Sequence, residues 1–64
     1  MKKELKKLII DFVFENMQTF NLVNITVNKF RPYIYDESGT YLIGGEDVYN
    51  FIKDAVKLIT IHYN

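Results

Sequence analysis

Apolar residues recur at helical spacing near the start of the chain. At 100° per residue they form one stripe, made of Leu5, Leu8, Ile9, Phe12, Val13, Met17 and Phe20, flanked by Ile10 and Phe14. The apolar arc covers roughly two-thirds of the helix, whereas an ordinary surface helix has a stripe of about 100°. The sequence therefore predicts a helix over residues 3–20, ended by Asn21, which tolerates a left-handed conformation. Because the surplus apolar surface needs a cover, we expect a homodimer with Ile10 and Phe14 at its interface.

The middle of the chain alternates with a period of two. Three β-branched residues on one side are separated by polar residues on the other, which is typical of a half-buried strand over residues 22–30: Val23, Ile25 and Val27 against Asn24, Thr26 and Asn28. Pro32 ends this strand because it has no N–H to donate. Residues 33–36 and 40–43 predict two further short strands. They are joined by a turn over residues 36–39, in which Gly39 can take a positive φ.

Helical spacing returns in the last third of the chain. A helix over residues 46–62 is predicted, with Glu46 and Asp47 in its first turn, where the helix dipole favours negative charge. Its apolar face contains Val48, Ile52, Ala55, Val56, Ile59 and Tyr63. The order helix–strand–strand–strand–helix predicts a single small α+β domain over residues 1–64. In that fold a three-stranded antiparallel sheet carries two helices packed on one face.

The predicted hairpin leaves open which face of the sheet is exposed. One face carries Tyr33, Tyr35, Tyr41 and Ile43, and the other carries Ile34 and Leu42. Burying three tyrosines would leave three hydroxyls seeking partners in a very small core. We favour the aliphatic face inside and the tyrosine face outside, where it predicts a protein-binding surface. The alternative interpretation is cross-strand tyrosine pairing that only stabilises the hairpin.

Composition narrows the function classes. Eight basic residues balance eight acidic ones, so no global field attracts nucleic acid or an anionic membrane. The absence of Cys excludes disulfides and thiolate metal sites. No apolar run approaches the roughly 20 residues of a membrane span, and Asp11 interrupts the apolar start, so neither a membrane segment nor a signal peptide is expected. We expect a cytoplasmic protein, and the bias to Lys, Asn, Ile, Phe and Tyr suggests a phage-like, low-GC origin.

No set of residues forms a catalytic, metal or cofactor motif. The Gly44–Gly45 pair lacks the Lys-Ser/Thr that follows a phosphate loop, and His62 has no Cys to activate. A chain this short is also expected to lack a cleft of several hundred Å³ for a small-molecule substrate. We therefore expect no enzyme activity, no cofactor and no metal.

A lysine cluster supports an alternative function. Nucleic-acid binding would use the tyrosine face together with Lys2, Lys3, Lys6, Lys7 and Arg31. Glu4, Asp11 and Glu15 dilute that positive field, and a solvated helix start explains the lysines equally well. The sequence thus favours a non-enzymatic protein-interaction module, of the regulator or inhibitor type, that acts as a homodimer on a protein target.

Overall fold

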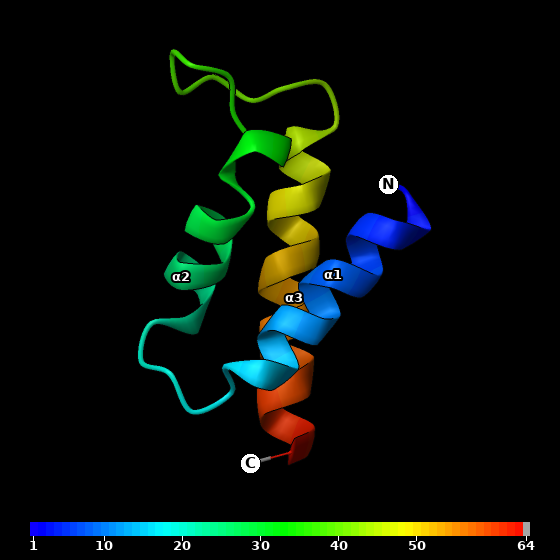
Figure 1. Cartoon of the computed structure of the whole chain (residues 1–64), viewed down its shortest axis with the longest axis vertical. Coiled ribbons are helices and arrows are strands. Elements are labelled where there is room, and N and C mark those ends of the chain that lie inside the picture. The colour runs from blue at the N-terminus through cyan, green and yellow to red at the C-terminus, as the bar shows by residue number, and fades with distance from the viewer. Residues whose placement is uncertain (64) are drawn as a thin grey trace.

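The computed structural model describes residues 1–63, and over this range the chain is helical (Figure 1). Its elements are α1 (Lys3–Glu15), α2 (Leu22–Lys29), the 3-10 helix η1 (Arg31–Tyr33) and α3 (Gly45–Tyr63). In Figure 1, α3 runs along most of the long axis of the molecule, α2 lies alongside it, and α1 crosses it at an angle. None of the helices among the described residues combines the length and apolar character that a membrane crossing requires.

The predicted α+β fold, a three-stranded antiparallel sheet with two helices packed on one face, is wrong. Residues 1–63 contain no strand, and the only β-type pairing among them is an isolated bridge between Tyr35 and Tyr41. The predicted strands at 33–36 and 40–43 are replaced by η1 and an irregular loop. Pro32 suits the first turn of η1, where its fixed φ fits and a missing N–H costs nothing.

The predicted strand over residues 22–30 is instead helix α2. The helical spacing of Leu22, Thr26 and Phe30 places all three in the core, with exposed fractions of 6%, 0% and 5%. Thr26 can occupy a buried position because its hydroxyl donates a 2.7 Å hydrogen bond to the Leu22 carbonyl oxygen. The β-branched residues that suggested a strand lie half-buried on the flanks of this helix. Packing against the other helices thus overrides local β propensity.

Helix α1 is shorter than predicted and ends at Glu15 rather than residue 20. The Asn16 side-chain amide donates a 2.8 Å hydrogen bond to the Phe12 carbonyl oxygen, and the Asn16 backbone leaves helical geometry at φ −120°. Phe20, predicted on the buried stripe, is 85% exposed in the connection to α2. Asn21 does adopt the expected left-handed conformation (φ 56°), but it precedes α2 instead of ending α1.

Helix α3 confirms the predicted 46–62 helix to within one residue at each end. It supplies Val48, Ile52, Ala55, Val56 and Ile59 to the core, whereas Tyr63 of the same predicted face is 64% exposed. Helices α1 and α2 each add two buried residues, and Phe30 and Ile34, from the segment after α2, complete the core. Helix α3 is therefore the element on which the rest of the chain packs.

Candidate functional site

The 34–44 loop, at the top of Figure 1, is held by its own hydrogen bonds. The Asp36 carboxylate accepts from the Ser38 hydroxyl (2.7 Å), the Ser38 N–H (2.9 Å) and the Thr40 N–H (3.0 Å). The hydrogen bond from the Ser38 hydroxyl, followed by that from the Thr40 N–H, holds the pKa of Asp36 below its ordinary value. Gly39 takes φ 86°, which confirms the predicted turn over residues 36–39.

A second turn in the same loop presents Ile43 to solvent. The Gly45 N–H donates to the Leu42 carbonyl oxygen at 2.8 Å, and Gly44 takes φ 80°, as the third position of a type II turn requires. Ile43 stands at the second position with its side chain fully exposed (108%). The turn is anchored to the core because the Leu42 N–H donates to the Ile34 carbonyl oxygen at 2.9 Å. A Cβ on Gly45 would collide with that same oxygen.

Aromatic and cationic side chains brace the loop against α3. Arg31 lies 4.9 Å from the centroid of Tyr35, which stacks on Tyr41 at 5.1 Å with an angle of 14° between rings. Tyr41 in turn contacts Tyr49 of α3 at 6.4 Å, and Lys53 lies 5.1 Å from the Tyr49 centroid. We call this series of five residues the tyrosine stack. Loss of hydration in the stack, followed by the neighbouring Tyr35 hydroxyl, raises the pKa of Tyr41 above its ordinary value.

The structure brings together only part of the predicted tyrosine face. Tyr35 and Tyr41 pair with each other, and Ile43 follows two residues later at the loop tip. Tyr33 lies elsewhere, next to Phe30, with 6.4 Å between the ring centroids. Of the aliphatic pair predicted inside, Ile34 is fully buried but Leu42 is 38% exposed.

Sequence reasoning missed the two members of the stack that α3 supplies. Tyr49 and Lys53 are four residues apart, so they share one face of the helix. That spacing places the two side chains together on α3, but it does not show that the loop returns to them.

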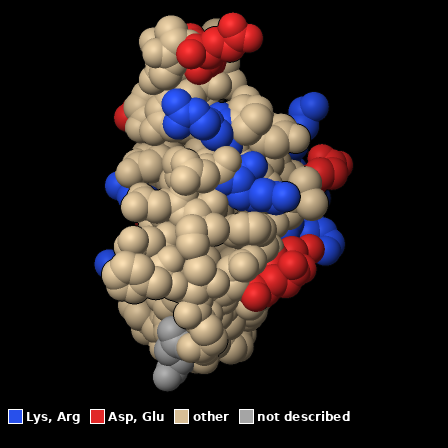
Figure 2. All heavy atoms as spheres, turned by 60° about the vertical axis from the view of Figure 1, so that its left-hand side comes forward, with Lys and Arg blue, Asp and Glu red and all other residues tan. Residues whose placement is uncertain are grey.

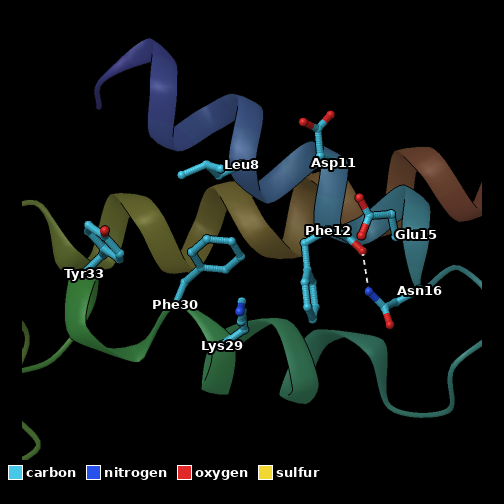
Figure 3. A pocket seen from close by; sticks show the side chains of 8 residues that line it. All are labelled: Leu8, Asp11, Phe12, Glu15, Asn16, Lys29, Phe30 and Tyr33. Carbon is cyan, nitrogen blue, oxygen red and sulfur yellow. Dashed lines mark hydrogen bonds between the residues drawn. The ribbon is translucent and has the colours of Figure 1, made fainter.

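A cleft of about 640 Å³ lies between α1 and the end of α2, contrary to the expectation that so short a chain lacks one. Phe12 and Phe30, both in its lining, meet edge-on, with 5.9 Å between ring centroids and an angle of 87° between the rings. In Figure 3, Lys29 lies between the two rings in the view. The remaining lining residues are Leu8, Asp11, Glu15, Asn16 and Tyr33. We call this site the α1–α2 cleft.

Two polar groups of the α1–α2 cleft have partners within the fold. Asp11 points away from α2 in Figure 3, and its carboxylate is ion-paired with Lys7 at 2.8 Å. The Asn16 amide is held by the Phe12 carbonyl oxygen. Among residues 1–63, no three His, Cys, Asp or Glu side chains gather where they could hold a metal ion.

A second hollow, of about 340 Å³, lies between α1 and α3 and is almost wholly apolar. We call it the α1–α3 groove, and its lining is Ile10, Phe14, Phe51, Asp54, Ala55, Leu58, Ile59 and Tyr63. At one end Phe14 meets Tyr63 edge-on, with 5.1 Å between ring centroids. At the other end the Lys6 ammonium lies 5.9 Å from the centroid of Phe51. Ile10 and Phe14, the predicted dimer-interface residues, thus lie side by side on this groove.

The N-terminal lysines are exposed but do not form one free basic surface. Lys7 is paired with Asp11, whose hydrogen bond and charge raise the pKa of Lys7, and Lys6 covers Phe51. Arg31, the fifth predicted nucleic-acid contact, is stacked on Tyr35. In Figure 2, acidic side chains lie at the upper end and along the right-hand edge of the face that carries α2, and basic side chains lie between them. Lys2 and Lys3 remain as exposed cations at the start of α1.

Comparison of the chain with models of protein families, with characterised proteins and with solved structures gives no match.

Proposed function

We propose that this chain is a small cytoplasmic protein-interaction module, of the regulator or inhibitor type, that docks on a protein target through its 34–44 loop. The observation that carries the proposal is Ile43, a β-branched apolar side chain fully exposed at the tip of a hydrogen-bonded turn. Burial of such a side chain in a partner contributes about 1.5–3 kcal/mol. Since the loop is already ordered by its own hydrogen bonds, little conformational entropy is lost on docking.

The charge around the loop indicates what kind of partner would fit. Residues 31–53 contain two cations, Arg31 and Lys53, against four carboxylates at positions 36, 37, 46 and 47. An apolar pocket rimmed by Lys or Arg would accept Ile43 and attract these carboxylates. A target with an acidic rim would be repelled.

The nucleic-acid alternative has less support. Base stacking needs a free aromatic face, but Arg31 and Tyr41 both lie against the ring of Tyr35. The carboxylates of the loop would also repel a phosphate backbone. Nor do we propose an enzyme, because the Asp11 carboxylate and the Asn16 amide of the α1–α2 cleft are already engaged within the fold.

The test is affinity capture from lysate of the source cell, quantified by mass spectrometry, with wild-type protein and two variants. Ile43→Ser removes the proposed anchor, and Ile61→Ser is the matched control because Ile61 is 64% exposed on α3, away from the loop. We expect a protein that wild type and Ile61→Ser retain equally and that Ile43→Ser retains about tenfold less.

The same experiment contains the outcome that rejects the proposal. Equal retention of every protein by wild type and Ile43→Ser would exclude Ile43 as the anchor. Retention of nucleic acid that falls steeply with salt, and that a Lys3→Glu/Lys7→Glu variant loses, would favour the alternative function.

A further inference from the structure

The α1–α3 groove exposes apolar surface that the fold does not cover. Leu58 and Tyr63 are 55% and 64% exposed and Phe14 is 41% exposed, although all three border the same hollow. This surface lies on the helical body and not on the 34–44 loop, so it would be free while the loop is docked. Its charge, shape and area indicate what covers it.

Charge at the groove is balanced within one copy. Asp54 is the one charged residue in its lining, and Lys6 is the cation that lies over Phe51 at its end. A strongly basic or strongly acidic partner therefore gains little here. Two copies of the same surface, each carrying one cation and one anion, can approach without net repulsion.

The two ends of the groove also complement each other under a two-fold rotation. One end has the cation Lys6, and the other has the edge-on rings of Phe14 and Tyr63. A two-fold axis through the middle of the groove brings the Lys6 end of one copy to the aromatic end of the second copy, and the reverse. An ammonium beside aromatic rings is a favourable contact.

The area available for this contact is small. From Phe51 to Tyr63 the helix rises about 18 Å, and two side-by-side helices are about 20 Å wide, which gives a footprint on the order of 360 Å². A standard interface buries roughly 800 Å² per partner, which is about a sixth of the 4738 Å² surface of this chain. The groove therefore fits a reversible dimer better than an obligate one.

We propose that a second copy of this chain covers the α1–α3 groove, forming a two-fold dimer that dissociates in the micromolar range. Such a dimer would present two 34–44 loops on one particle, so that a target with two sites would be bound by avidity. The inference does not depend on the function proposed for the loop.

Sedimentation equilibrium between ~1 and ~500 μM tests the dimer. We expect the weight-average mass of the wild type to rise from 7.6 kDa toward twice that value. Leu58→Glu should stay monomeric over the whole range, because it places a carboxylate against the apolar surface of the second copy. Ile43→Glu, on the loop, is the matched control and should dimerise as the wild type does.

Two further measurements keep the test decisive. Far-UV circular dichroism of each variant reports whether it is folded, and Tyr63→Ser replaces Leu58→Glu if that variant unfolds. A wild type that remains at 7.6 kDa up to ~500 μM, or a folded Leu58→Glu that dimerises normally, would overturn the proposal. Co-sedimentation of a monomeric wild type with phosphatidylcholine–phosphatidylglycerol vesicles, lost in Leu58→Glu, would also overturn it by identifying a lipid surface as the occupant.

Failure here is distinct from failure of the loop proposal. Self-association is measured on the purified protein with variants of α3, whereas target capture is measured with a variant of the loop. Either proposal can therefore fail in its own experiment while the other holds.

Discussion

The 34–44 loop and the α1–α3 groove both present apolar side chains to water, but they position them by different means. In the loop, backbone and side-chain hydrogen bonds around Asp36 and Leu42 fix a single protruding residue, Ile43. In the groove, two packed helices define a shallow surface, and no single side chain dominates it. The loop should therefore respond to changes in turn chemistry, while the groove should respond to changes in core packing.

Helix α3 supports both regions, so a cavity in its buried face should affect both together. Ile52 is fully buried, and Ile52→Ala should lower the free energy of unfolding by roughly 2–5 kcal/mol. Domains of this size have about 5 kcal/mol in total, so much of the population should unfold. Urea titration measures the loss, and the exposed Ile61→Ala should change stability by no more than ~0.5 kcal/mol. A loss of unfolding free energy below ~1 kcal/mol for Ile52→Ala would contradict the conclusion that the rest of the chain packs on α3.

Substitutions at the two glycines that join the 34–44 loop to α3 test the loop separately from the groove. Gly45→Ala places a Cβ on the Ile34 carbonyl oxygen, which also accepts the Leu42 hydrogen bond, and we expect a cost of about 3 kcal/mol. Gly44→Ala is the matched change, because its Cβ meets nothing within 4 Å and only the positive φ is strained, at about 1 kcal/mol. Urea titration gives both values. A larger loss for Gly44→Ala would show that turn strain, not close approach, controls the junction.

Acid should loosen the loop while leaving the groove intact. The pKa of Asp36 is lowered in the folded protein, so its hydrogen bonds to Ser38 and Thr40 are fully present above about pH 4 and are lost as pH falls through the folded pKa. The amide proton shifts of Ser38 and Thr40, followed by NMR from pH ~6 to ~2, should report this change. Asp36→Asn should abolish the pH dependence, and Glu37→Gln should preserve it. Shifts in Leu58 or Phe14 over the same range that disappear in Asp36→Asn would break the separation between loop and groove.

The elements that could be predicted from sequence are those in which one pattern decides the structure. Residues 46–62 have a consistent helical stripe, and the turn at Asp36 and Gly39 has its own side-chain chemistry. Residues 22–30 fit both a strand and a helix, and the choice depended on whether Thr26 faces solvent or core. Thr26 can be buried only because its hydroxyl donates a hydrogen bond to the Leu22 carbonyl oxygen. The alternating pattern of the sequence does not reveal this hydrogen bond.

The candidate surfaces were predictable to a similar degree. Ile10 and Phe14 share a groove because they share a helix face, which spacing alone shows. The tyrosine stack depends on how the loop returns to α3, so Tyr49 could not be assigned to it without the fold. Tyr33 was misplaced for the same reason, since η1 turns it toward Phe30.

The uneven division of the core has a consequence for synthesis on the ribosome. Half of the described buried apolar residues belong to α3, the last of the helices to be made. An eight-residue helix such as α2 is marginal in water on its own, so the earlier segments have nothing to pack against until α3 emerges. At about 5–20 residues per second the nascent chain would stay unpacked for several seconds. During that interval Ile9, Val13 and Leu22 are open to chaperones, and folding is necessarily delayed until α3 has been made.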